Sequence, residues 1–147
     1  MTGGTLTLIG IIIGEKGTGK TKQILNLAND ACLTAKGSIV FIDYDNSYMY
    51  DVSNRIRYIN ASDYSIRSPK ELFGFICGIA AMDYDLEKIY VDGLIKIVHH
   101  DLETLQGMFE EMDAFLQKRG IDLIVSINNS PDKAIPEFLE KYILIQD

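Results

Sequence analysis

Long apolar runs, paired cysteines and metal-ligand motifs are all missing from this 147-residue sequence. A helix needs about 20 apolar residues to cross a bilayer, and the first residues lack the basic stretch and cleavage site of a secretory signal. We therefore expect a cytoplasmic chain with no membrane span. Cys32 and Cys77 fall in apolar helical patterns, which favours two reduced core thiols. His99 and His100 have no Cys or His partner at metal-ligand spacing, so no zinc-type site is expected.

Positive charge is also scarce, with 14 Lys and Arg against 21 Asp and Glu and a formal net charge of −7. Tight binding to nucleic acid needs a basic surface. No cluster of Lys and Arg stands out, so we do not expect a nucleic-acid partner. Apolar residues make up 47% and charged residues 24%, which is ordinary for a globular protein. The length predicts a single domain over residues 1–147 with its own core.

Strand signals recur along the chain as short apolar runs rich in β-branched residues. Runs of the kind that is buried on both faces occupy residues 6–13, 38–43, 88–92 and 122–127. A shorter alternating run at 55–60 predicts an edge strand, and a last apolar stretch covers 143–145.

Helical spacing of apolar residues fills the intervals between these runs. It extends over 21–35, over 69 to about 82 behind a Ser68 cap, and after Asp101, which we expect to cap a helix that ends near 118–120. A short helix is expected from Pro136. Alternating strands and helices predict an α/β fold, a three-layer sandwich with a mainly parallel sheet and helices on both faces.

The sequence GEKGTGKT at 14–21 follows the first predicted strand. Gly14, Gly19, Lys20 and Thr21 match the spacing of a phosphate-binding loop, which requires a strand before it and a helix after it. Glycines let backbone N–H groups turn toward the phosphates, and the helix adds its positive end. Lys20 would reach the β- and γ-phosphates, and the Thr21 hydroxyl would ligate Mg²⁺. The predicted nucleotide-binding residues are Gly14, Glu15, Lys16, Gly17, Thr18, Gly19, Lys20, Thr21 and Lys22.

With this loop, the chain resembles the P-loop NTPase superfamily over most of its length. The sequence KIYVD at 88–92 is similar to the Walker B strand of that superfamily. The resemblance implies the P-loop NTPase fold, ATP and Mg²⁺ as cofactors, and Asp92 as the residue that holds the water shell of the metal. The chain also resembles a group of short ATP-binding proteins of Gram-positive bacteria.

Single residues of this sequence differ from the motifs of several subclasses of P-loop protein. A GTPase would have Asp-x-x-Gly at the metal strand, but Asp92 is followed by Gly93, Leu94 and Ile95, so the motif's glycine is missing. NSPD at 129–132 lacks the lysine of the guanine-binding motif. Partitioning-type ATPases carry an extra loop lysine where this chain has Glu15, with Lys16 one position later. ATP is therefore favoured over GTP, and the partitioning subclass is disfavoured.

RecA-like ATPases are the preferred relatives. Their water-polarising acid would correspond to Asp43 or Asp45, and their polar sensor to Asn128 or Asn129. Of the two acids we favour Asp45, with Asp43 as the alternative. We expect catalytic roles for Lys20 and for one of these acids.

The sequence names no arginine that would stabilise charge on the leaving phosphates. We therefore predict a slow ATPase that acts as a nucleotide-dependent switch or as a subunit of a larger assembly, with a protein partner or a second copy of itself. The alternative is a small-molecule kinase, although the segment after 122–127 lacks the arginines of a kinase lid. Residues 44–54 and 93–100 are expected to be loops that the γ-phosphate orders. Their apolar surface would include Leu94, Ile95, Ile97 and Val98.

Overall fold

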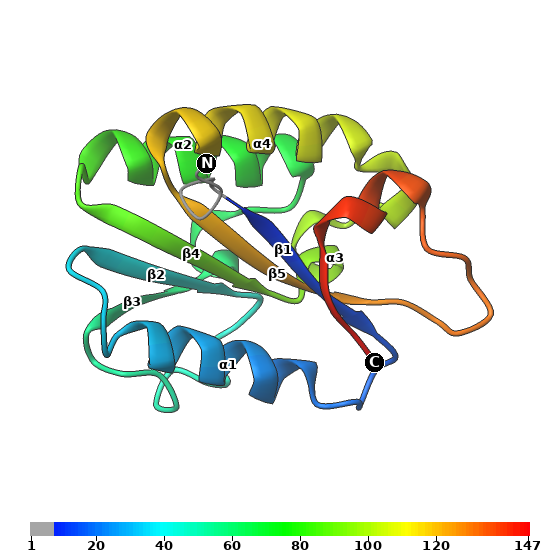
Figure 1. The fold of residues 1–147 in the computed structure, drawn as a ribbon, viewed down its shortest axis with the longest axis horizontal. Helices are drawn as coiled ribbons and strands as arrows, with labels where there is room; N and C mark the ends of the chain where they lie inside the picture. The colour runs from blue at the N-terminus through cyan, green and yellow to red at the C-terminus, as the bar shows by residue number, and fades with distance from the viewer. Residues whose placement is uncertain (1–7) are drawn as a thin grey trace.

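A single parallel sheet organises the chain in the computed structural model, which describes residues 8–147. Residues 6 and 7 of the first predicted strand lie outside the described residues. The six strands are β1 (Ile9–Gly14), β2 (Ser38–Asp43), β3 (Ile56–Asn60), β4 (Leu86–Asp92), β5 (Asp122–Asn128) and β6 (Ile143–Gln146) (Figure 1). Their spatial order is β3-β2-β4-β5-β1-β6, and all neighbours are parallel. The prediction of an edge strand at 55–60 is confirmed.

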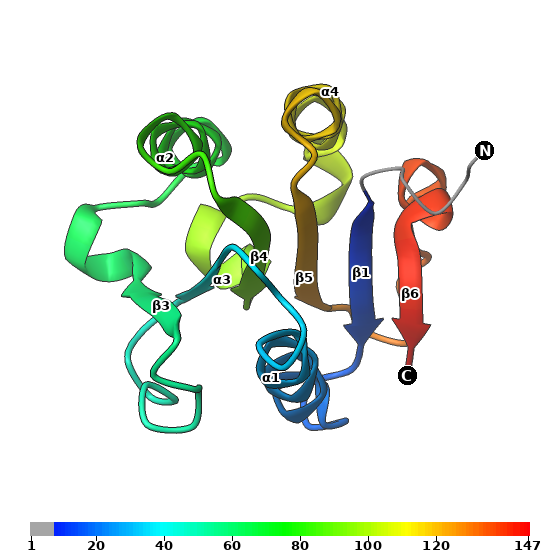
Figure 2. The same cartoon turned by 60° about the vertical axis from the view of Figure 1, so that its left-hand side comes forward.

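Helices cover both faces of this sheet. They are α1 (Lys20–Ala31), α2 (Pro69–Met82), α3 (Leu94–Val98) and α4 (Gln106–Arg119), with 3-10 turns η2 (Ala61–Tyr64), η3 (Leu102–Thr104) and η4 (Glu137–Tyr142). Figure 2 shows α1 below the sheet and α2 and α4 above it. The predicted α/β class is confirmed, and this arrangement is compatible with a three-layer sandwich. No helix within residues 8–147 is long and apolar enough to span a membrane.

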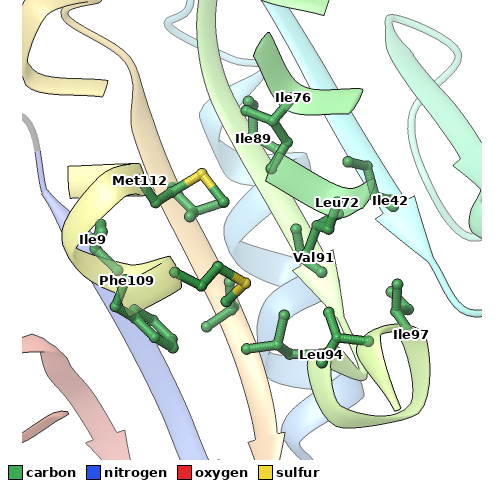
Figure 3. Close-up of a cluster of buried hydrophobic side chains, with 14 of the residues drawn as sticks. Ile9, Ile42, Leu72, Ile76, Ile89, Val91, Leu94, Ile97, Phe109 and Met112 are labelled. Carbon is green, nitrogen blue, oxygen red and sulfur yellow. The ribbon is translucent and has the colours of Figure 1, made fainter. Parts of the chain in front are cut away.

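Two cores form because successive side chains of a strand point to opposite faces. Ile11 and Ile13 of β1 join the core under α2 and α4, whereas Ile12 joins the core under α1. Ile89 and Tyr90 of β4 divide in the same way. Strands buried on both faces need apolar residues at every position, and this explains the continuous apolar runs in the sequence. Figure 3 shows part of the larger core.

Helix starts were predicted with mixed success. The Ser68 cap of α2 is confirmed, because its hydroxyl accepts a hydrogen bond from the Glu71 N–H at 3.1 Å and Pro69 follows at the first helical position. The prediction that Asp101 caps the next helix is wrong. Both the N–H and the hydroxyl of Thr104 donate to the Asp101 carbonyl, at 3.0 and 2.6 Å, and close a 3-10 turn. The helix α4 therefore begins only at Gln106.

One predicted helix ends earlier in the structure, and another is of a different type. The helix α1 ends at Ala31, four residues before the predicted end, because the chain leaves it in tight turns. The short helix expected from Pro136 is the 3-10 turn η4.

The segment 93–100 was predicted as a loop with an exposed apolar surface, and this is wrong. It contains the short helix α3, whose Leu94, Ile97 and Val98 are at most 1% exposed. Figure 3 shows Leu94 and Ile97 inside the larger core. Gly93 adopts a left-handed conformation, with φ of 80°, and turns the chain back against the sheet directly after β4. These apolar side chains therefore stabilise the fold.

Candidate functional site

A pocket of about 500 Å³ lies where four strands end and α1 begins. Parallel strands place their carboxyl ends at one edge of a sheet, where ligands of α/β proteins bind. The strand register brings Gly14 beside Asn128 and Asp43 beside Asp92. The pocket is lined by Lys16, Gly17, Gly19, Lys20, Thr21, Asp43, Tyr44, Asp45, Ser47, Tyr48, Asp92, Gly93, Lys96, Ser126 and Asn128.

One wall of the pocket is the loop between β1 and α1. Gly17 and Gly19 have φ of 86° and 92°, a conformation that other residues rarely adopt. A Cβ atom at either position would meet no atom within 4 Å. Glycine is therefore needed there for its backbone conformation. The Thr18 hydroxyl donates to the Glu15 carbonyl at 2.8 Å and closes the loop on itself.

Lys20 is buried, with 6% of its surface exposed, at the first position of α1. Its Nζ donates to the Glu15 carbonyl at 2.6 Å. Burial lowers the pKa of Lys20, while Asp147, Asp92 and Glu15 act in the opposite direction. The loop thus holds a partly desolvated ammonium group beside the positive end of a helix, an arrangement that suits an anion.

Asp92 connects the loop to the opposite wall. Its Oδ2 accepts a hydrogen bond from the Thr21 hydroxyl at 3.1 Å, and its Oδ1 accepts one from the Ser126 hydroxyl at 2.5 Å. The Ser126 hydroxyl in turn accepts from the Gly93 N–H at 2.8 Å. Thr21 and Asp92 were both predicted from the sequence, and the fold brings them together across 71 positions.

Ser126 was missed in the sequence. It is 3% exposed and lies in β5, whose other central residues are apolar. A single hydroxyl inside an otherwise apolar strand was the available signal, because a buried polar group needs a hydrogen-bond partner.

Asp43 ends β2 beside Asp92 and is 4% exposed. Its Oδ2 accepts from the Tyr58 hydroxyl at 2.5 Å, and its Oδ1 accepts from the Tyr44 N–H at 2.8 Å. Burial raises the pKa of Asp43 to about 6, the two hydrogen bonds oppose this rise, and the neighbouring Asp92 adds to it. The pocket therefore contains a buried carboxyl group that would gain from a nearby cation.

Asp45 lies just after β2 in the same wall. Its Oδ1 accepts from the Ser47 N–H at 2.9 Å, and this contact holds the pKa of Asp45 below its ordinary value. The Tyr58 hydroxyl oxygen also lies 3.1 Å from the Asp45 carbonyl oxygen, and its single proton is shared between this weaker contact and the Asp43 carboxylate. One phenol thus connects both candidate acids to the edge strand β3.

Some residues predicted for the site lie outside the pocket wall. Gly14, Glu15, Thr18 and Lys22 do not line the pocket, and Lys22 is exposed on α1. Of the two candidate sensors, Asn128 lines the pocket, whereas the Asn129 side chain donates to the Lys133 carbonyl at 3.1 Å.

The residues at the junction of the two walls suit a magnesium ion that a ligand helps to hold. Mg²⁺ is usually bound through one or two carboxylates, with waters and substrate phosphates completing an octahedron. The Thr21 hydroxyl and the Asp92 and Asp43 carboxyls provide such a donor set. Within residues 8–147 no group of three or more His, Cys, Asp or Glu side chains could hold a metal by itself.

No family model matches the chain, and no curated protein matches it either. The chemistry of the pocket therefore carries the functional argument. A glycine-rich loop, the buried Lys20 and the carboxyl groups of Asp43, Asp45 and Asp92 share one cavity.

Proposed function

We propose that this chain is an ATP- and Mg²⁺-binding protein of the P-loop NTPase superfamily. It is a slow ATPase that acts as a nucleotide-dependent switch or as a subunit of a larger assembly. The hydrogen bond between Thr21 and Asp92, at 3.1 Å, carries this proposal. It joins the phosphate loop to the strand β4 at the point where the metal and the phosphates of a nucleotide would meet.

The loop supplies the phosphate site. Backbone N–H groups of residues 16–19, the first turn of α1 and the Lys20 ammonium would surround the β- and γ-phosphates. On binding, Lys20 exchanges the Glu15 carbonyl for a phosphate oxygen, which is a stronger acceptor because it is charged. Thr21 would ligate Mg²⁺ directly, and Asp92, held by Ser126, would accept from its water shell. Bound Mg²⁺ neutralises charge on the phosphates.

The two acids after β2 differ in their free hydrogen-bonding capacity. Both carboxylate oxygens of Asp43 already accept hydrogen bonds within the protein. Asp45 uses one oxygen for the Ser47 N–H, a contact that also lowers its pKa, and its other oxygen accepts no hydrogen bond from the described residues. Asp45 is therefore the better candidate for orienting a water molecule, and Asp43, which lies beside Asp92, would act near the metal.

We expect slow turnover because the basic residues that line the pocket, among those that the structure describes, are all lysines. Efficient phosphoryl transfer uses an arginine to stabilise charge in the transition state, and this arginine increases the rate by about 10³ to 10⁵. No arginine among residues 8–147 lines the pocket. A partner or a second copy of the chain would have to provide one, and this supports a switch or subunit role.

Binding is tested by thermal unfolding with and without Mg·ATP. We expect Mg·ATP to raise the unfolding temperature of the wild type, because a ligand that binds only the folded state stabilises it. Lys20→Ala should weaken ATP binding roughly a hundred-fold and remove most of this shift, since a charged contact to phosphate is lost. Equal shifts in both proteins, or no shift in the wild type, would contradict the proposal.

Hydrolysis is tested by ADP release with no added acceptor. We expect the protein to release ADP slowly, and we expect chelation of Mg²⁺ to abolish this release. Release that requires a small-molecule acceptor would support a kinase instead, and fast turnover of many ATP molecules per second by the isolated chain would contradict a slow switch.

A further inference from the structure

The wall of the pocket opposite the phosphate loop contains one cation, Lys96. It lies four positions after Asp92, on the helix α3. Among the described residues that line the pocket, the other basic ones are Lys16 and Lys20, and both belong to the loop. Within residues 8–147, Lys96 is thus the only basic residue that lines the pocket from an element other than the loop and the start of α1.

The position of Lys96 is fixed by the core. Leu94, Ile97 and Val98 anchor α3 in the core that α2 and α4 cover, and Figure 3 shows Leu94 and Ile97 in this packing. The turn before α3 is held by the hydrogen bond from the Gly93 N–H to Ser126. With one face buried, the helix presents Lys96 on its exposed face, at the pocket.

No carboxylate among the described residues forms an ion pair with Lys96, although its charge, after the Ser47 hydrogen bonds, also lowers the pKa of Asp45. The only ion pair within residues 8–147 joins Lys88 to Asp122. The Lys96 Nζ lies over the Tyr44 ring, 5.8 Å from its centre. A cation–π contact at an exposed site is weak, so Lys96 can leave Tyr44 for a charged ligand.

A triphosphate in this pocket would place its terminal phosphate among carboxyl groups. Asp43, Asp45 and Asp92 all line the pocket, and they repel a terminal phosphate that carries about two negative charges. Lys20 and Mg²⁺ offset this repulsion from the loop side. A cation on the acidic side would act on the terminal phosphate and hardly at all on a diphosphate, which ends closer to the loop.

We propose that Lys96 binds the terminal phosphate of a bound nucleoside triphosphate and so makes the site prefer triphosphates over diphosphates. This inference rests on the proposed function. When Lys96 moves to the phosphate, Tyr44 loses its cation partner. The contacts of the segment that begins at Tyr44 therefore depend on whether the third phosphate is bound. This dependence gives the proposed switch a physical basis.

The preference is tested by titrating the full chain, with Mg²⁺, with ADP and with an ATP analogue whose β,γ-bridge cannot be hydrolysed. Lys96→Met keeps the length of the side chain and removes its charge. It should weaken analogue binding about tenfold or more and change ADP binding less than about twofold. Lys96→Arg should restore most of the preference, and Lys118→Ala, on the exposed end of α4, is the matched control without effect.

The outcomes separate this inference from the proposed function. If the wild type binds neither nucleotide, or binds them as Lys20→Ala does, both fail. If Lys20→Ala loses both nucleotides but Lys96→Met binds the analogue and ADP as the wild type does, only the role of Lys96 is overturned.

Hydrogen exchange tests the link to Tyr44. In the wild type, exchange over residues 44–50 should differ between the analogue and ADP complexes. In Lys96→Met the two complexes should exchange alike. A difference of the same size in both proteins would show that the segment detects the third phosphate without Lys96.

Discussion

The two walls of the pocket are built in different ways. One wall comes from a single short segment, residues 16–21, of which all but Thr18 line the pocket, and the left-handed backbone of Gly17 and Gly19 shapes it. The other wall collects side chains from β2, β4, β5 and α3, held by buried hydrogen bonds that centre on Asp92. The comparison teaches that the loop wall depends on local backbone conformation, whereas the opposite wall depends on long-range polar contacts. Substitutions in the two walls should therefore differ in size and in pH dependence.

Ser126→Ala should have the largest effect on stability. It leaves the Gly93 N–H without its acceptor and the Asp92 Oδ1 without its donor, and both groups are inside the protein. An unsatisfied buried group costs about 1–3 kcal/mol, and more when it is charged. We expect about 3 kcal/mol lower stability in urea unfolding, together with weaker Mg²⁺-dependent ATP binding.

The exposed Ser62, whose hydroxyl donates to the Asn60 side chain at 2.6 Å, provides a matched control. Ser62→Ala should change stability by less than about 1 kcal/mol, because water replaces the lost partner. Similar losses in both variants would show that the wall around Asp92 is not specially sensitive to a missing hydroxyl.

Asp43→Asn should stabilise the protein at pH 7.5 in the absence of nucleotide. Because burial raises the pKa of Asp43 from 3.8 to about 6, ionising the carboxyl destabilises the folded state by at most about 3 kcal/mol. We expect a gain of about 2 kcal/mol, since an amide bonds Tyr44 and Tyr58 less strongly than a carboxylate does.

The size of the stabilisation by Asp43→Asn depends on pH. The penalty is absent below pH 3.8, grows as the pH rises toward 6 and is complete above 6. The gain from Asp43→Asn should therefore disappear in unfolding experiments near pH 4. Asp51→Asn, at an exposed position, should give no such pH-dependent gain. A gain that persists unchanged at pH 4 would rule out ionisation as its cause.

Gly19→Ala should have the smallest effect on stability, about 1 kcal/mol of destabilisation. The new Cβ meets no atom within 4 Å, so only the left-handed backbone, with φ of 92°, opposes it. Gly74→Ala in α2 is the matched control, because its Cβ also meets open space but its backbone is helical. It should stabilise by about 0.5–1 kcal/mol. Destabilisation by both variants would remove the conformational explanation of the loop wall.

Sequence patterns predicted the strands well and some connections poorly. Apolar runs covered on both faces leave a strong signal, and β2 matches the predicted strand from Ser38 to Asp43. The turn at Asp101 depends on which acceptor Thr104 selects, and a capping pattern does not encode this choice. The helix α3 was missed because five residues are too few to show a helical period, and only packing against α2 and β5 reveals its buried face.

The sequence by itself located the glycine-rich turn between β1 and α1 and selected Asp92 as a candidate metal-binding acid. Spacing within eight residues specifies a turn whose glycines and lysine act locally, so no distant contact is needed to recognise it. Only the tertiary structure decided that Ser126 hydrogen-bonds Asp92, that Tyr58 hydrogen-bonds Asp43 and that Lys96 lines the same pocket as the loop. These contacts join residues from separate strands and helices, and the order of strands in the sheet alone brings them to one edge.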